Sequence, residues 1–198
     1  MPVVIIQGRA FLGRLIDLTI GHSSPQYRIN LNAESRADLR AVFYLMLESL
    51  KTLRLYSDAA EAHGGYSAVF GSNWFTGEWP PAMQPFHLTI KEFFPIVLAV
   101  EIWGNVLTNH KILFFTDNAA VVDIINNTTC KDKVIMKLVH RLVVAALKYN
   151  IFFRAKHIPG KHNIVCDLLS RFSFQKARSV APWLASQQTT IPTQLFSV

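Results

Sequence analysis

The sequence predicts an α/β fold of five strands and several helices, preceded by a small helical appendage. Two observations predict it. The period of the apolar residues changes from helical to strand-like near residue 53, and short apolar runs alternate with helical stretches from there on. With 198 residues, of which 51% are hydrophobic, the chain can bury one good core. We therefore expect an appendage over residues 1–52, an α/β domain over residues 53–178 and a loosely ordered tail over residues 179–198.

The appendage is predicted to contain two helices. The stretch "GRAFLGRLIDLTI" (residues 8–20) has a helical pattern and is followed by the loop "GHSSPQ". A second helix is expected in "NAESRADLRAVFYLMLESLK", because its apolar residues recur at helical spacing and Asn32 can cap its start.

Three strands and a long helix are predicted next. The pieces "RLYSDAA", "GYSAVFGS" and "NWFTGEW" are separated by Gly-containing turns, as in an antiparallel meander. In "HLTIKEFFPIVLAVEIWGNVL", Thr89 and Glu92 have the spacing of a capping box. Pro95 would then lie beyond the first turn, where proline breaks a helical hydrogen bond. The sequence thus predicts a kink near Glu92 or a later helix start, and Glu92 as the least securely placed acid.

The stretch "ILFFTDNAAVVDI" places a carboxylate between a strand and a helix. The apolar run is too short for a helix and predicts a buried strand, after which Asn118 can cap a helix. Asp117 would lie at the carboxyl end of that strand, where open α/β sheets bind ligands. A helix over residues 132–149, the strand "IFFRAKHI", the turn "PGKHN" and a helix holding "VCDLLSRF" are expected to follow.

Four acids lie where elements begin or end, flanked by apolar residues: Asp58, Glu92, Asp117 and Asp167. A buried carboxylate is costly unless its charge is compensated, and no Arg or Lys is paired with any of them in the sequence. Mg²⁺ would compensate them, and two such ions can stabilise the entering and leaving oxygens of a phosphoryl displacement. The alternatives are ordinary structural roles: a capping box for Glu92, a helix cap for Asp117, a first-turn acid for Asp167 and an Asx-turn for Asp58.

The net charge of +7 is unevenly distributed. Residues 131–178 contain eleven Lys or Arg against two acids, which indicates either a polyanionic partner or a solvated basic face. Aromatic side chains near residue 75 can stack on a nucleic acid or, as we favour, pack in the core. The residues expected to contact phosphates are Lys133, Lys137, Arg141, Lys156 and Lys161. The aromatic residues for which stacking and core packing are the alternatives are Trp74, Phe75 and Trp79.

Several blocks together resemble, in order and spacing, the RNase H domain of retroelement reverse transcriptases, and DIRS-type elements most of all. The blocks are "LYSDAAEAHGGYSAVF", "TIKEFFPIVLAVEIWG", "FFTDNAAVVDIIN" and "AKHIPGKHNIVCDLLSRF". The segments "GRAFLGRLIDLT" and "NLNAESRADLRA" are similar to the stretch that joins polymerase and RNase H. The resemblance implies an RNase H-like fold, a five-stranded mixed sheet with helices on both faces, and hydrolysis of the RNA strand of RNA–DNA hybrids.

The resemblance also implies roles for residues. Asp58 would bridge two Mg²⁺ ions, for which Mn²⁺ can substitute; Asp167 would help hold the ion that activates water, and Glu92 with Asp117 the other ion. His162 and His157 are candidates for the family's loop histidine, and each can equally be structural. The implied partners are an RNA–DNA hybrid and the polymerase part of a reverse transcriptase. The alternatives are a non-catalytic nucleic-acid-binding remnant and a structural connector in a polyprotein.

The sequence predicts an intracellular protein of the nucleus or cytoplasm that does not enter a membrane. No segment is uniformly apolar over the roughly 18 residues that a membrane span needs. The start "MPVVIIQGRAF" has neither a basic segment before its apolar patch nor a small-residue cleavage site after it. Cys130 and Cys166 lack the spacing of a metal or redox site, so we expect them to be reduced.

Overall fold

The computed structural model describes residues 31–40, 50–60 and 64–196. The chain divides into two compact units, Met1–Lys51 and Thr52–Val198. In the first unit, residues 33–40 are helical, and the backbone N–H of Ser35 donates to Asn32 Oδ1 at 2.8 Å, which confirms Asn32 as the predicted cap. The helix expected over residues 8–20 lies outside the described residues.

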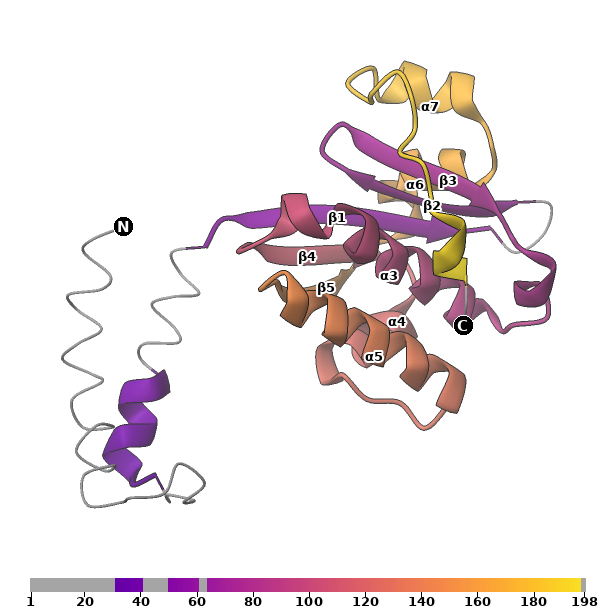
Figure 1. Ribbon diagram of the computed structural model, residues 1–198. Helices are drawn as coiled ribbons and strands as arrows, with labels where there is room; N and C mark the ends of the chain where they lie inside the picture. The colour runs from indigo at the N-terminus through magenta and orange to yellow at the C-terminus, as the bar shows by residue number, and fades with distance from the viewer. Residues whose placement is uncertain (1–30, 41–49, 61–63, 197–198) are drawn as a thin grey trace. The chain divides into compact units, whose positions relative to one another are not determined.

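The second unit is built on a five-stranded mixed sheet in the order β3-β2-β1-β4-β5 (Figure 1). Strands β1 (Thr52–Ala59), β2 (Gly65–Phe70) and β3 (Asn73–Glu78) form the predicted antiparallel meander. Strands β4 (Lys111–Thr116) and β5 (Phe152–His157) continue the sheet parallel to β1. The carboxyl ends of these three parallel strands therefore lie at one edge of the sheet.

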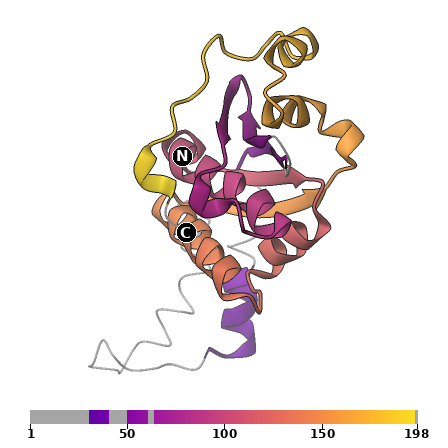
Figure 2. The same cartoon turned by 90° about the vertical axis from the view of Figure 1, so that its right-hand side faces the viewer.

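Helices cover both faces of the sheet, as predicted (Figures 1 and 2). Helix α3 packs on β1 and β2, α5 packs on α3, and α4 lies along β5. On the other face, α6 packs on β1 and β2, and α7 packs on α6. No helix in the described parts of the chain is long and apolar enough to cross a membrane. The bounds are Leu88–Leu107 (α3), Ala119–Asn127 (α4), Lys133–Lys148 (α5), Ile164–Ser170 (α6) and Phe174–Val180 (α7), with short 3₁₀ helices at Pro81–Met83 (η1), Gly160–His162 (η2) and Thr193–Phe196 (η3).

Helix α3 starts earlier than the sequence predicts. Its N-cap is His87, whose side chain accepts a hydrogen bond from the Thr89 backbone N–H, so the expected capping box of Thr89 and Glu92 is wrong. The helix runs through Pro95, so the alternative of a later start is wrong too. Every residue from Ile90 to Val100 is buried. Burial of this central helix against the sheet outweighs the local penalty of one proline.

We expect Pro95→Ala to raise the free energy of unfolding by about 1 kcal/mol. An interior proline costs a helix about 3 kcal/mol relative to alanine, and the loss of two buried ring methylenes, at about 0.8 kcal/mol each, offsets roughly half of that. Urea denaturation measures the change. Pro81→Ala is the matched control, because Pro81 lies at the start of η1, where proline is tolerated. A Pro95→Ala protein less stable than the parent would show that ring packing dominates.

The tail differs from the loosely ordered segment that we expected. Ala181 and Leu184 are buried against the α6 side of the sheet. The backbone N–H of Ala185 donates to the Ser72 carbonyl at 2.8 Å, and that of Thr189 donates to the Trp74 carbonyl at 2.7 Å. The tail thus satisfies backbone groups along β3, an edge strand. Backbone pairing of this kind needs no periodic side-chain pattern, so no local pattern in the sequence predicts it.

Candidate active site

Three acids from distant parts of the sequence meet at the carboxyl end of the parallel strands. Asp58 lies near the end of β1, Asp117 directly follows β4, and Glu92 lies in the second turn of α3. One carboxylate oxygen from each of the three lies within 4.8 Å of the others. Asp58 and Glu92 are each only 5% exposed, whereas Asp117 is exposed. The group is therefore an acidic site that is open to solvent through Asp117.

Asp58 is held by α6 on the opposite face of the sheet from α3. The Ser170 hydroxyl donates to Asp58 Oδ2 at 2.6 Å. Burial raises the pKa of Asp58 to about 6, and the negative charges of Asp117 and Asp167 act in the same direction. The hydrogen bond from Ser170 and the charge of Arg171 lower that pKa and only partly offset the rise.

Glu92 is the more strongly perturbed acid. Burial raises its pKa to about 9, the charges of Asp58 and Asp117 add to the rise, and a hydrogen bond from the Ala59 backbone opposes it. Its Oε2 is buried and has no hydrogen-bond partner. A buried carboxylate oxygen without a partner is unusual in a native core. Without a cation, Glu92 is therefore protonated at neutral pH.

These features fit a divalent metal ion. Carboxylate oxygens are the donors that hard cations such as Mg²⁺ take, and a cation would supply the partner that Glu92 Oε2 lacks. It would also offset the burial and the repulsion by neighbouring carboxylates that raise the pKa of Asp58 and Glu92. The residues that would hold it are Asp58, Glu92 and Asp117.

Asp167, the fourth predicted acid, lies outside this group. Its Oδ1 accepts a hydrogen bond from Arg171 Nε at 2.7 Å, with the two side chains 41% and 59% exposed. The sequence-based expectation that Asp167 has no paired cation is therefore wrong, and the spacing of four residues within one helix was the signal that could have found the pair. Glu92, expected to be the least securely placed acid, belongs to the group instead.

The loop that follows β5 packs directly against Asp117. A Cβ atom at Gly160 would lie 2.9 Å from Asp117 Oδ2, so a larger residue there would require this exposed carboxylate to move. His157 Nε2 lies 3.0 Å from the Asp117 backbone carbonyl. Lys161 and His162 are exposed on the same short helix. The loop therefore presents a cation and an imidazole near the acidic site.

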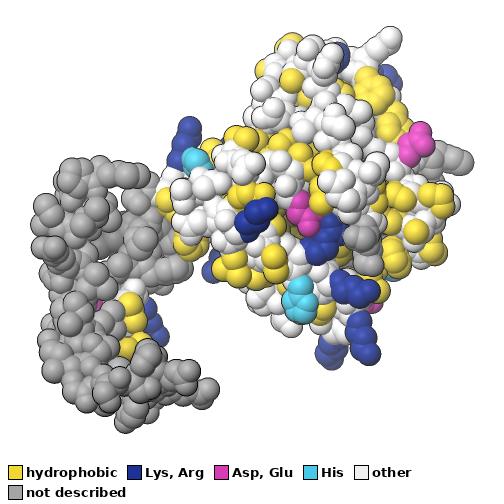
Figure 3. Space-filling model, viewed as in Figure 1, with side chains coloured by type: hydrophobic (Ala, Val, Ile, Leu, Met, Phe, Trp, Pro, Cys, Tyr) yellow, Lys and Arg dark blue, Asp and Glu magenta, His cyan; other side chains and the backbone are white. Residues whose placement is uncertain are grey.

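The lysines predicted to contact phosphates lie in two separate places. Lys156 and Lys161 are exposed on β5 and η2, whereas Lys133 and Lys137 are exposed on α5. Figure 3 shows Lys and Arg side chains gathered along the lower edge of the face in view. The aromatic residues Trp74, Phe75 and Trp79 are buried in the core, as favoured.

Arg141 is engaged inside the protein. Its Nε donates to Glu101 Oε1 at 3.0 Å and its NH2 group to Glu101 Oε2 at 2.6 Å, and NH2 also reaches the Leu195 carbonyl at 2.9 Å. The side chain is only 20% exposed. This two-point ion pair neutralises the charge of Arg141 and fixes its orientation, so we withdraw Arg141 as a phosphate contact.

Comparisons with known proteins identify the fold. No protein-family model matches the sequence, and no curated protein matches it either. The structure of LC11-RNase H1 in complex with an RNA/DNA hybrid matches with a TM-score of 0.52 and 14% identity, over 63% of this chain and 98% of that one. RNase H1 of Halobacterium salinarum NRC-1 gives a TM-score of 0.49, 14% identity and the same coverage. The protease–reverse transcriptase of prototype foamy virus matches over 74% of this chain and 21% of that one, at 13% identity and a TM-score of 0.38.

The strand order and the helices on both faces of the sheet agree with the match to LC11-RNase H1. At 14% identity, the likeness concerns the fold and not the chemistry. The second unit of this chain has the RNase H fold.

Proposed function

We propose that this chain is a divalent-metal-dependent endonuclease that hydrolyses the RNA strand of RNA–DNA hybrids. The observation that carries the proposal is the convergence of Asp58, Glu92 and Asp117 within 4.8 Å at the carboxyl end of two parallel strands. The solved structure of LC11-RNase H1 with an RNA/DNA hybrid supports the substrate class. The sequence resemblance to DIRS-type elements supports an origin in, or a place within, a retroelement reverse transcriptase.

The acids would hold Mg²⁺ or Mn²⁺, with Asp167 serving a second ion. Such ions, when bound, supply an activated water and charge stabilisation at the leaving oxygen. Ser170 orients the Asp58 carboxylate, and the exposed Asp117 faces the side from which a substrate can approach. The exposed His162 is the candidate for moving a proton near the phosphate.

Lysine side chains would hold the substrate through its phosphates. Lys156 and Lys161 lie beside the acidic site, and Lys133 and Lys137 offer further contacts from α5. Phosphate contacts release counterions, so binding of a hybrid should weaken steeply with salt. Such contacts position a duplex without reading its sequence.

The ion pair of Asp167 with Arg171 favours a second candidate, a nucleic-acid-binding remnant without activity. In this arrangement the cation that compensates Asp167 is the guanidinium of Arg171, not a metal ion. Arg171 binds Oδ1 of Asp167, so a metal ion at Asp167 would bind Oδ2 or compete with Arg171 for Oδ1. The two candidates therefore differ in whether Mg²⁺ binds Asp167 in the presence of Arg171.

A cleavage assay on a hybrid with a labelled RNA strand tests the proposal. We expect cleavage with Mg²⁺ or Mn²⁺, none with EDTA, and none of single-stranded RNA or of a DNA duplex of the same sequence. Hybrid binding, measured in EDTA, should fall as salt rises. Salt-sensitive binding without cleavage in either metal would overturn the enzyme and support the remnant.

A further inference from the structure

One part of the sheet carries exposed side chains beside the acidic site, on the face that α6 covers only in part. Leu55, Phe114 and Ala155 point from β1, β4 and β5 into the core on the α3 side. Because side chains alternate along a strand, their neighbours point to the opposite face. There, α6 packs mainly on β1 and β2. On this face, beside α6, the three strands place side chains in register with one another. These are Arg54 and Tyr56 of β1, Leu113 and Phe115 of β4, and Arg154 and Lys156 of β5.

These side chains combine aromatic rings with cations. Tyr56 stacks on Phe115 with ring centroids 4.8 Å apart and planes 12° apart. Arg54, Arg154 and Lys156 are exposed around this pair. Among the described side chains of the three strands that point to this face, the first acid is Asp58, at the end of β1. This arrangement suits a polyanion that also has flat rings to stack.

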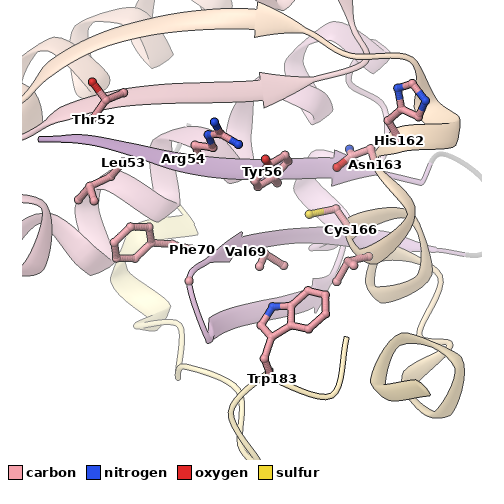
Figure 4. A pocket seen from close by; sticks show the side chains of 12 residues that line it. Thr52, Leu53, Arg54, Tyr56, Val69, Phe70, His162, Asn163, Cys166 and Trp183 are labelled. Carbon is pink, nitrogen blue, oxygen red and sulfur yellow. The ribbon is translucent and has the colours of Figure 1, made fainter. Parts of the chain in front are cut away.

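A pocket of about 540 Å³ extends the same surface (Figure 4). Arg54 and Tyr56 line one side of it and Trp183, from the tail, lines the other, with Val69 and Phe70 of β2 between them. Trp183 is 59% exposed, although it is a large apolar side chain. An exposed indole across a pocket from a tyrosine provides two ring faces for a planar guest.

We infer that this surface binds a single-stranded nucleic acid, RNA or DNA alike. Its accessible members, Arg54, Tyr56, Arg154, Lys156 and Trp183, are called the strand platform below, and the buried ring of Phe115 supports Tyr56. Unpaired bases can stack on its rings while phosphates meet its cations, and such contacts read neither the 2′-hydroxyl nor a base edge. A duplex has its bases stacked inside and can use only the cations.

The positive charge of the platform argues against two other occupants, the N-terminal segment of this chain and a second copy of the chain. Residues 1–51 contain six Lys or Arg and four Asp or Glu, so this segment is itself basic. A second copy of the chain, with a net charge of +7, would also meet the platform with like charge. A polyanion is the complementary partner.

The platform leads directly to the acidic site. Tyr56 precedes Asp58 by two residues on β1, and Phe115 precedes Asp117 by two residues at the end of β4. A bound single strand would thus extend toward the carboxylates. If the proposed nuclease activity holds, the platform would hold the unpaired strand that extends from a hybrid; its affinity for single strands does not depend on that activity.

Intrinsic fluorescence and anisotropy test the inference on the full chain in EDTA, where no cleavage occurs. Trp74, Trp79 and Trp103 are all at most 8% exposed, so Trp183 is the exposed tryptophan among the four. We expect oligothymidylate and oligouridylate of about 15 nucleotides to quench its emission and protect it from acrylamide, with similar affinities. Trp183→Phe should remove the quenching and keep the binding.

Substitutions separate the platform from a general charge effect. Trp183→Ala and Arg154→Gln should each weaken single-strand binding by about tenfold. The matched controls, Leu147→Ala for an exposed apolar side chain and Lys148→Gln for an exposed cation, both on α5, should change it by less than about twofold. Trp183→Ala should leave hybrid binding unchanged, because a duplex offers no free base.

Three results would overturn the inference. They are the absence of single-strand binding, equal weakening by Lys148→Gln and Arg154→Gln, and a dimer that Trp183→Ala disperses. Hybrid cleavage with no single-strand binding would reject the platform and keep the proposed function. Single-strand binding without hybrid cleavage would keep the platform and reject the proposed function.

Discussion

Asp58→Asn is expected to lower Mg²⁺-dependent cleavage of an RNA–DNA hybrid by about a thousandfold or more while the protein still binds the hybrid. Asn keeps the shape of the side chain and can still accept the hydrogen bond from Ser170, so the fold is preserved. It removes the charge of a carboxylate at the centre of the acidic group. The cations that would hold the hybrid are untouched.

The same substitution should stabilise the metal-free protein above neutral pH. Asp58 is buried and repelled by Asp117 and Asp167, so its charge is costly unless a cation is bound. We expect a higher Tm than that of the parent in EDTA near pH 8, together with the loss of activity. Such opposite effects on stability and activity distinguish a site residue from a structural one.

Two further variants complete this experiment. Asp117→Asn should also abolish cleavage, and Asp123→Asn, an exposed acid on α4, is the matched control that should change neither activity nor Tm. Cleavage assays and anisotropy with a labelled hybrid measure the two activities. Cleavage by Asp58→Asn or Asp117→Asn at the rate of the parent would exclude these acids as metal ligands.

The stability of the metal-free protein should fall as pH rises, which is the second large effect. The pKa values of Asp58 and Glu92 are raised from 3.8 to about 6 and from 4.5 to about 9. The folded state therefore keeps protons that the unfolded chain releases. The stabilisation from the protonated forms is complete below about pH 4 and is lost as pH rises through about 6 for Asp58 and toward about 9 for Glu92.

At pH 7 each acid has lost about 3 kcal/mol of this stabilisation, since one pKa unit corresponds to about 1.4 kcal/mol. Asp58 is then ionised in the folded state, whereas Glu92 keeps a proton that the unfolded chain has released. A divalent cation reverses this loss, because it binds the ionised carboxylates of the folded protein. The rise in Tm on adding Mg²⁺ should therefore be larger near pH 8 than near pH 5.5. Differential scanning calorimetry in EDTA and in Mg²⁺ at both pH values measures it.

The double variant Asp58→Asn, Glu92→Gln is the control for the pH effect. Neither side chain titrates in it, so Tm in EDTA should be nearly independent of pH over this range and Mg²⁺ should add little. A parent protein that grows more stable in EDTA from about pH 5.5 to about pH 8 would contradict the burial of these two acids.

The sequence by itself determined the elements and the order in which they follow one another. The change of apolar period predicted the meander, the strand "ILFFT" and the helices, and Asn118 and Asp132 cap α4 and α5 through their side chains. These features depend on residues only a few positions apart, so the local pattern carries them. The place of Asp117 at the carboxyl end of a strand was foreseeable in the same way, because the strand and the helix cap that flank it are both local patterns.

Only the tertiary structure decided which groups meet and how they are charged. It joined Asp58, Glu92 and Asp117, paired Asp167 with Arg171, and engaged Arg141 inside the protein. Helix α3 also continues through Pro95, and the tail forms backbone hydrogen bonds along β3. These outcomes depend on burial and on contacts between residues far apart in the chain. Desolvation and packing energies exist only once those residues are brought together, so no local pattern of the sequence records them.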